Sequence, residues 1–279
     1  MIKIQAENIE KKFPLKKDQR IYINSSENGG LQVLKGLNLS IKKGEFITLV
    51  GPSGCGKSVF LDIVGGLTKM SGGNVFLDGK KVNGPDPQLG YVFQQYALLP
   101  WRTAISNIEY PLEIRGVDSV KRKEKAKKLL SLIGLKGFDK WLPYQLSGGM
   151  QQRVAIARSL STDPEVLLMD EPFAALDAQT RELLQEELLR VWEGIKNTVV
   201  FVTHSIEEAV FLADRVVVMT ARPGSVKDII DIDLPRPRGE NTRSSVAFGT
   251  YRHRIWEALK DEVNKAQKDL GLLAGNNEK

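Results

Sequence analysis

The residues of this chain with the clearest chemical meaning lie in the octapeptide GPSGCGKS at residues 51–58. It follows the apolar run EFITLV and leads into SVFLDIVGGL, so it joins a predicted strand to a predicted helix. Its glycines allow the backbone to wrap an anion, and successive N–H groups at the helix N-terminus then point at that anion. Lys57 would reach the β- and γ-phosphates of a nucleotide, and the Ser58 hydroxyl would hold Mg²⁺. The spacing therefore predicts a site for nucleotide phosphates.

A pair of carboxylates ends a second apolar run, VLLMDE at residues 166–171. In open α/β sheets, ligands bind beyond the carboxyl ends of the strands, so Asp170 is placed to hold Mg²⁺ directly or through water. Glu171 would act as the general base that orients and polarises an attacking water. Alone, the pair could equally be two solvated acids at a strand end. Because the same chain contains the phosphate loop, we favour the catalytic interpretation.

Two further polar residues follow predicted strands. Gln94 comes after LGYVF (89–93), and its neutral amide could contact Mg²⁺ or the attacking water without adding charge. His204, one of 2 histidines, comes after TVVFVT (198–203) and could contact the γ-phosphate. For each residue taken alone, a structural role is equally compatible with the sequence.

The octapeptide LSGGMQQR at residues 146–153 resembles a second anion site. Ser147 is predicted to cap a helix that begins near Gly148. Gly148 and Gly149 allow a backbone to come close to an anion. Alone, this segment indicates a plain capped helix start. Only the presence of the other motifs in the same chain favours a role in binding an anion.

In order along the chain, GPSGCGKS, VFQ, LSGGMQQR, VLLMDEP, ALD and VTH resemble the motifs of ATP-binding cassette (ABC) ATPases, over about residues 2–234. The resemblance implies an α/β, P-loop NTPase (RecA-like) core with an antiparallel β subdomain and an inserted helical subdomain. It implies ATP and Mg²⁺ as cofactors. It also implies that two copies pack head to tail, so that each ATP lies between the phosphate loop of one copy and the Ser147–Gly149 loop of the other.

The same resemblance gives roles to individual residues. Gln94 would be the Q-loop residue, Asp177 of ALD the D-loop aspartate, and His204 the switch histidine. Phe13 would stack on adenine, with Tyr22 as the weaker alternative. Catalysis is thus expected from Glu171, His204 and Gln94, the metal ligands are Ser58, Gln94 and Asp170, and the nucleotide contacts are Phe13, Gly51, Pro52, Ser53, Gly54, Cys55, Gly56, Lys57, Ser58, Val59, Ser147, Gly148, Gly149 and Asp177.

Two positions depart from the family pattern. Val59 stands where the family usually has Thr, so its N–H remains but a hydroxyl contact to the α-phosphate is lost. Ala174 stands where related chains often have Gly, and we expect little effect.

The elements that must position these residues alternate between strands and helices around apolar runs, which predicts an α/β core with a parallel sheet. Residues 95–162 differ, because three segments at helical spacing follow one another and predict a helical insert. We expect an ATPase domain over residues 1–234, with the helical subdomain at about 95–162. Residues 235–279 are expected to be a linker, at 235–243, and a C-terminal helical extension.

Composition narrows the class of protein. Apolar residues make up 42% of the 279, but no apolar run approaches the ~20 residues that span a bilayer. Cys55 is the single cysteine, which suits a reducing compartment, and a small filler residue is favoured there over a reactive thiol. The net charge is +6, and the basic run KRKEKAKK (121–128) indicates a solvated helix face. The positive net charge favours one alternative, a soluble ABC ATPase that acts on nucleic acid. Because no aromatic residues are interleaved with the basic ones in this run, we expect no nucleic acid partner.

The chain contains one cassette and no long coiled-coil heptads, and in this it resembles the ATPase subunit of a transporter. The resemblance implies a location at the cytoplasmic face of the cell membrane. Its implied partners are a second ATPase chain, identical or similar, two transmembrane permease subunits and, indirectly, an extracytoplasmic substrate-binding protein. The docking surface would be QQYALLPWRTAISNIEYPL (94–112), where Trp101 and Arg102 line it or Trp101 belongs to the core of the insert. LLPWRTAISNI and ARPGSVKDIIDIDLPRPR resemble the ATPases of nitrate, sulfonate and taurine importers. We therefore expect a small anion as cargo, with another small organic molecule as the alternative.

Overall fold

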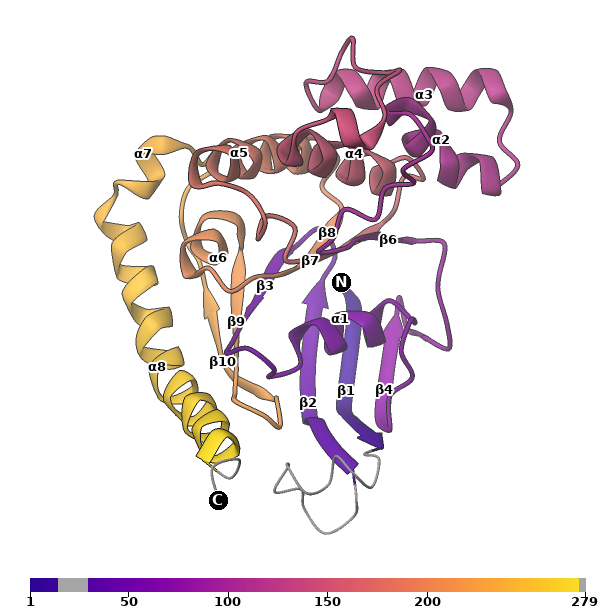
Figure 1. Cartoon of the computed structure of the whole chain (residues 1–279). Helices are drawn as coiled ribbons and strands as arrows, with labels where there is room; N and C mark the ends of the chain where they lie inside the picture. Colours follow the sequence, from indigo (N-terminus) through magenta and orange to yellow (C-terminus); the bar gives the residue numbers. More distant parts are fainter. Residues whose placement is uncertain (15–29, 276–279) are drawn as a thin grey trace. The chain divides into compact units, whose positions relative to one another are not determined.

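The computed structural model describes residues 1–14 and 30–275, with side chains up to residue 268. The chain divides into two compact units (Figure 1). Unit 1 comprises Met1–Asp86, Val202–Leu234 and Glu240–Lys279, and unit 2 comprises Pro87–Phe201 and Pro235–Gly239. This division assigns strands as well as helices to unit 2, and the boundary expected at residue 235 stays a prediction.

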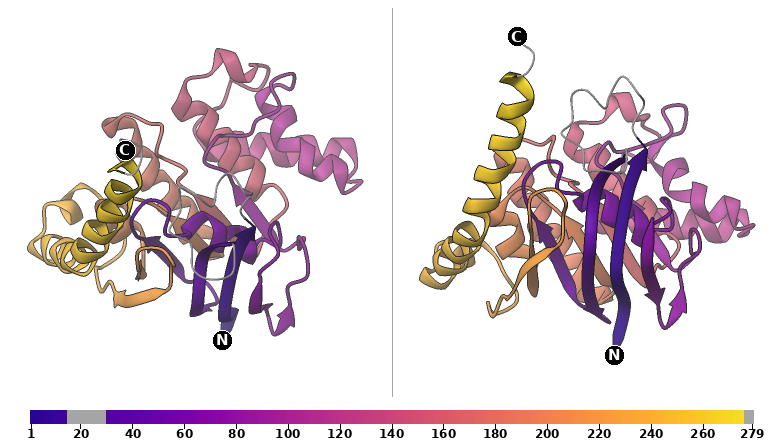
Figure 2. Two further views of the ribbon diagram at one scale, coloured as in Figure 1. Left: turned by 60° about the horizontal axis from the view of Figure 1, so that its bottom comes forward. Right: turned by 90° about the horizontal axis from the view of Figure 1, so that it is seen from below.

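Unit 1 contains an antiparallel sheet, as expected. Its strand order is β2-β1-β4-β5, and every neighbouring pair is antiparallel. In Figure 2 the indigo strand β1 lies beside its neighbours along most of its length. Pro14, the last residue of β1, pairs with Gly30, the first residue of β2. Residues 15–29, with Tyr22, lie outside the described residues. The strands are β1 (Ile2–Pro14), β2 (Gly30–Lys42), β4 (Gly72–Leu77) and β5 (Lys80–Lys81).

A second set of strands in unit 1 has the order β10-β9-β3. These are β3 (Phe46–Val50), β9 (Arg215–Met219) and β10 (Val226–Asp231). Strand β3 pairs parallel with β9, and β10 pairs antiparallel with β9. All five residues of β3 are buried, as is typical of a strand covered on both faces.

The helices of unit 1 pack on these strands. Helix α1 (Lys57–Val64) follows the phosphate loop, and α6 (Ile206–Leu212) contacts β3. The long helix α8 (Val246–Gly275), yellow in Figures 1 and 2, lies against α6, β9 and β10. The segment expected to be a linker contains the short helix α7 (Glu240–Arg243), which the sequence did not predict. Its charged ends complement the helix dipole, and the Arg243 guanidinium stacks 3.7 Å from the Phe211 ring centroid.

Unit 2 combines strands β6 (Leu89–Val92), β7 (Val166–Asp170) and most of β8 (Thr198–Val202) with the helical segment. Strands β6 and β7 are parallel, and β8 lies next to β7. Four helices begin at residues whose side chains accept a backbone N–H, namely Thr103, Asp118, Ser147 and Asp177. The sequence predicted one of these caps, Ser147, and each of the four supplies an acceptor that fixes where its helix begins. The helices are α2 (Ala104–Ile114), α3 (Ser119–Leu132), α4 (Gly148–Leu160) and α5 (Ala178–Ile195), and a 3₁₀ turn spans Pro143–Gln145.

The exposure of charged and apolar side chains can be compared with what the sequence predicts. The basic run on α3 is mostly exposed, in agreement with the predicted solvated face. Leu132 and Ile195 are about half exposed, and each is the last residue of its helix. Within residues 1–14 and 30–275, no helix combines the length and the hydropathy needed to cross a membrane.

Candidate nucleotide site

The phosphate loop of unit 1 has the shape of an anion cradle. Gly56 caps α1 at a φ of 103° with no side-chain hydrogen bond, so the first N–H groups of α1 have no side-chain cap. A Cβ on Gly56 would lie 2.6 Å from Leu34 Cδ2. Gly54 has a φ of +76° and nothing within 4 Å of the place where its Cβ would be. Both positions require glycine, one for close packing and one for a left-handed backbone at an open edge.

Lys57 is held inside this loop. It is 4% exposed, and its Nζ donates to the carbonyl oxygens of Gly51 at 2.9 Å and Pro52 at 3.2 Å. Burial raises the pKa of the neighbouring Cys55 thiol, an effect that the Lys57 charge only partly offsets. Cys55 therefore stays a thiol rather than a thiolate, which favours the interpretation of a small filler residue.

A second segment of unit 1 supports the loop from behind. Gly224 N donates to Val33 O at 2.7 Å, and Lys35 N donates to Gly224 O at 3.1 Å. A Cβ on Gly224 would lie 1.9 Å from the Cys55 carbonyl oxygen, so the two backbones touch. Strand β2 and the loop at residues 220–225 together form a wall under the phosphate loop.

His204 lies at the strand edge from which the phosphate loop emerges. The preceding residue, Thr203, donates its N–H to Leu49 O in β3 at 3.2 Å. Ser205, the following residue, caps α6. His204 is exposed, and β3 ends one residue before the phosphate loop. The structure thus brings His204 and the loop to one edge of unit 1.

Phe13 stands near the end of β1 and is 37% exposed. The ammonium of Lys11 lies 4.6 Å from its ring centroid, and Phe13 pairs with Leu31 in β2. Two and three residues further along β2, Val33 and Leu34 lie against Gly56 of the phosphate loop. A partly exposed aromatic ring is what adenine stacking needs, and the assignment of Phe13 to this role stays a prediction.

Gln94, Asp170 and Glu171 all belong to unit 2. Gln94 Nε2 donates to Glu171 Oε2 at 3.3 Å, so the structure joins two residues that sequence analysis had assigned separately. Glu171 has a φ of 43°, a left-handed conformation that costs a non-glycine residue energy and is concentrated at functional sites. Asp170 is the last residue of β7 and is half-buried.

The LSGGMQQR segment also lies in unit 2. Ser147 Oγ accepts the Met150 N–H at 3.3 Å, which confirms the predicted cap, and Ser147 itself is exposed. A Cβ on Gly149 would lie 2.7 Å from Thr180 Cγ2, in the first turn of α5. Asp177 caps that turn, and its hydrogen bonds from Thr180 lower the pKa of its carboxyl. The Ser147–Gly149 loop and Asp177 are therefore neighbours.

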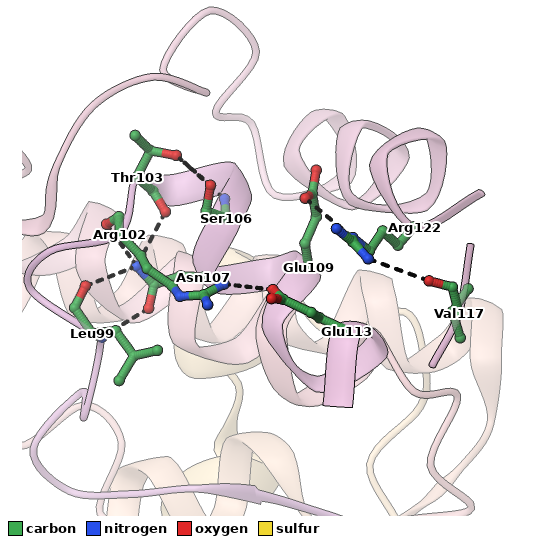
Figure 3. A network of polar contacts seen from close by, with 9 residues as sticks. All are labelled: Leu99, Arg102, Thr103, Ser106, Asn107, Glu109, Glu113, Val117 and Arg122. Atoms are coloured by element: carbon green, nitrogen blue, oxygen red, sulfur yellow. Dashed lines mark hydrogen bonds and ion pairs between the residues drawn. The ribbon is translucent and has the colours of Figure 1, made fainter. Parts of the chain in front are cut away.

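Asn107, which the sequence did not single out, is the centre of the network in Figure 3. Its side chain is fully buried, accepts the Leu99 N–H at 2.8 Å and donates to Leu99 O, Arg102 O and Thr103 O. Asn107 thereby fixes residues 99–103. Within this segment, Trp101 is 73% exposed. The alternative that Trp101 belongs to a core is wrong. The available signal was a lone Asn among the apolar residues of α2.

The residues expected to bind Mg²⁺ carry oxygen donors of the kind that this ion prefers. Among the described residues no group of three or more His, Cys, Asp or Glu gathers as a metal cage. Mg²⁺ commonly keeps waters and binds through a few protein oxygens together with substrate phosphates. The Ser58 hydroxyl, the Gln94 amide and the Asp170 carboxylate are oxygen donors of this kind.

This fold and these motifs define an ATP-binding P-loop ATPase. The sequence profile of the family "ABC transporter" matches residues 34–174. An uncharacterized ABC transporter ATP-binding protein of Methanocaldococcus jannaschii is 52% identical over 96% of this chain and 95% of its own length. The chain therefore belongs to the ATP-binding proteins of ABC transporters, ATPases whose hydrolysis is coupled to transport.

Two other similarities bear on function. An aliphatic sulfonates import ATP-binding protein of Bacillus cereus, SsuB, is 46% identical over 79% of this chain and 86% of its own length. Among solved structures, an ATP-binding cassette determined as a dimer in a post-hydrolysis state with ADP and Pi is 35% identical. The match has a TM-score of 0.70 and covers 83% of this chain and 100% of the other.

Proposed function

We propose that this chain is the energising subunit of an importer for a small anion, with sulfonates, nitrate and taurine as the candidates and another small organic molecule as the alternative. The similarity to a sulfonate import ATPase supports this cargo class. So do the segments LLPWRTAISNI and ARPGSVKDIIDIDLPRPR. The ATPase binds no cargo itself, so the assignment rests on the importer to which it docks.

Different residues of the ATPase site bind the nucleotide, hold the metal ion and act on the attacking water. The N–H groups of residues 51–58 and the Lys57 ammonium bind the phosphates, and Phe13 stacks on adenine. Ser58, Gln94 and Asp170 would hold Mg²⁺, which would supply positive charge to offset the negative charge that develops on the phosphates. Glu171 takes the proton of the attacking water, and His204 orients that water against the γ-phosphate.

The observation that carries the catalytic assignment is the contact between Gln94 Nε2 and Glu171 Oε2 at 3.3 Å. An amide donor fixes the orientation of the carboxylate without competing for the proton that a general base must accept. The left-handed backbone of Glu171 supports the same role, because such strain persists where the position of the side chain matters.

The active form is a dimer of cassettes, in which the exposed Ser147 loop of one chain completes the phosphate site of the other. The dimeric state of the similar cassette with ADP and Pi supports this arrangement. The neighbouring Asp177 lies at the same surface. Binding of ATP from two directions would close the dimer, and loss of phosphate would open it.

The docking partners are two transmembrane permease subunits, which this chain would bind at the cytoplasmic face of the membrane. A substrate-binding protein would act on the extracytoplasmic side. The loop at residues 99–103, held by Asn107, carries the exposed Trp101 that suits an anchor residue in a partner's pocket. Arg102 pairs with Glu113 at 2.7 Å and lies over the Tyr110 ring, which supports a fixed, shaped surface.

The test is reconstitution. The chain is purified with its membrane subunits, placed in proteoliposomes and supplied with ATP and labelled sulfonate, nitrate or taurine. We expect ATP-dependent uptake of one of these anions, and loss of uptake by a factor of about 10²–10⁴ with Glu171→Gln, which still binds ATP. Uptake of a cation or a sugar in place of the anions would contradict the proposal, as would full activity of the variant.

A further inference from the structure

Helix α8 carries a buried carboxylate in its apolar stripe. Phe248, Ile255 and Leu259 face the rest of unit 1 at helical spacing, and the next position of this stripe is Glu262, which is 3% exposed. A carboxylate in such a place costs free energy unless hydrogen bonds and charges compensate. The ATPase activity described above does not use this residue.

The partners of Glu262 fully account for its charge. Its Oε2 accepts the Ala221 N–H at 2.9 Å, and its Oε1 lies 2.9 Å from Lys227 Nζ and 3.3 Å from Lys265 Nζ. Burial by itself would raise the pKa of Glu262, but these hydrogen bonds hold that pKa below its ordinary value. The carboxylate therefore stays ionised and fixes Ala221 through a charge-assisted hydrogen bond.

Ala221 belongs to a closed loop at residues 220–225. Thr220 N donates to Ser225 O at 3.0 Å, and Ser225 N donates to Thr220 Oγ1 at 2.9 Å. Thr220 Oγ1 also donates to Pro223 O at 3.1 Å. Because these bonds tie the two ends of the loop together, a constraint at Ala221 is transmitted to the other residues of the loop.

The far side of the same loop touches the phosphate loop. Gly224 packs its backbone on the Cys55 carbonyl and is paired with β2 through Val33 O and Lys35 N. Residues of β2 pack in turn on Gly56. Glu262 is thus linked to the phosphate cradle by one hydrogen bond, one stiff loop and one close backbone contact.

We propose that Glu262 is a positioning residue for the nucleotide site, which holds the 220–225 loop and thereby fixes the backbone under the phosphate loop. The C-terminal helix then acts on ATP affinity without touching ATP. This inference rests on the proposed binding of ATP phosphates by residues 51–58.

The experiment measures MgATP binding to the full chain by titration calorimetry and backbone amide exchange in the nucleotide-free protein. Glu262→Ala should weaken MgATP binding about tenfold, the scale of one hydrogen bond to a charged group. Amides of residues 220–225 and 51–58 should exchange faster while those of buried β3 stay protected. Glu257→Ala, which removes an exposed acid from the same helix, is the matched control and should change neither quantity.

The outcomes are separable. Unchanged affinity in Glu262→Ala overturns the inference, and so does faster exchange spread through β3, since that is general destabilisation. If this variant does not fold, Glu262→Gln carries the test: weakening by roughly twofold to threefold supports the inference and unchanged affinity overturns it. Lys57→Ala serves as the reference variant. If Lys57→Ala binds MgATP normally, the phosphate site itself is refuted. If Lys57→Ala loses MgATP binding while Glu262→Ala binds MgATP normally, only the role of Glu262 is refuted.

Discussion

Replacement of Gly224 by Ala should damage the nucleotide site although Gly224 is not among the residues expected to bind the nucleotide. The new Cβ would lie 1.9 Å from the Cys55 carbonyl oxygen, and both atoms belong to backbone that cannot swing aside. A relaxed carbon–oxygen contact is about 3.3 Å, so the two backbones must separate by roughly 1.4 Å. The φ of Gly224 lies outside the left-handed region, so the effect is steric and does not come from backbone strain.

The size of the effect follows from that displacement. A misplacement of about 1 Å at a catalytic site costs on the order of 10²-fold in rate, equivalent to about 2.7 kcal/mol. We therefore expect kcat/KM for ATP to fall about 100-fold, together with a loss of stability of about 1–3 kcal/mol from overpacking. Phosphate release measured under steady-state conditions gives the first quantity, and urea unfolding gives the second.

Gly249→Ala is the matched control. Gly249 lies in α8 with nothing within 4 Å of its Cβ position, so the substitution should stabilise the helix by up to ~1 kcal/mol and leave hydrolysis unchanged. Normal kcat/KM in Gly224→Ala, with correct folding, would refute the reasoning that the 220–225 loop supports the phosphate loop.

Three further results are expected. Ser147→Arg should abolish turnover while ATP affinity of the monomer, measured by calorimetry, stays almost unchanged; a large loss of monomer affinity would mean that this loop binds ATP within its own chain. Asn107→Ala should lower the free energy of unfolding by about 3 kcal/mol, because backbone groups around a fully buried amide lose their partner, and should reduce co-purification with the permease. Asn264→Ala, at an exposed position, is its control, and equal effects of the two would contradict the role of Asn107. Because the folded pKa of Glu262 lies below its ordinary value of 4.5, this residue stabilises the fold above that pH and the contribution disappears as pH falls through the folded pKa. The difference in urea stability between wild type and Glu262→Gln should therefore be constant at neutral pH and shrink below about pH 4.5, and a difference that grows on acidification would contradict this assignment.

Much of the chain could be predicted because its signals are local. The predicted cap Ser147 precedes a helix that begins at Gly148, as expected, since a cap depends on hydrogen bonds within a few residues. The apolar runs at β3 and β7 became buried strands for the same kind of reason. The helical character of residues 240–243 was not predicted, because it depends partly on Arg243 stacking on a residue distant in sequence.

The sequence by itself determined the fold class, the class of ATPase and the order of the motifs, because each motif is a short contiguous run and the motifs support one another when they occur together in this order. Only the tertiary structure decided which side chains support those motifs. The Gln94–Glu171 contact and the path from Glu262 to the phosphate loop join residues far apart along the chain. In the sequence Glu262 is one acid among many in the chain, and burial beside the Ala221 N–H is what distinguishes it.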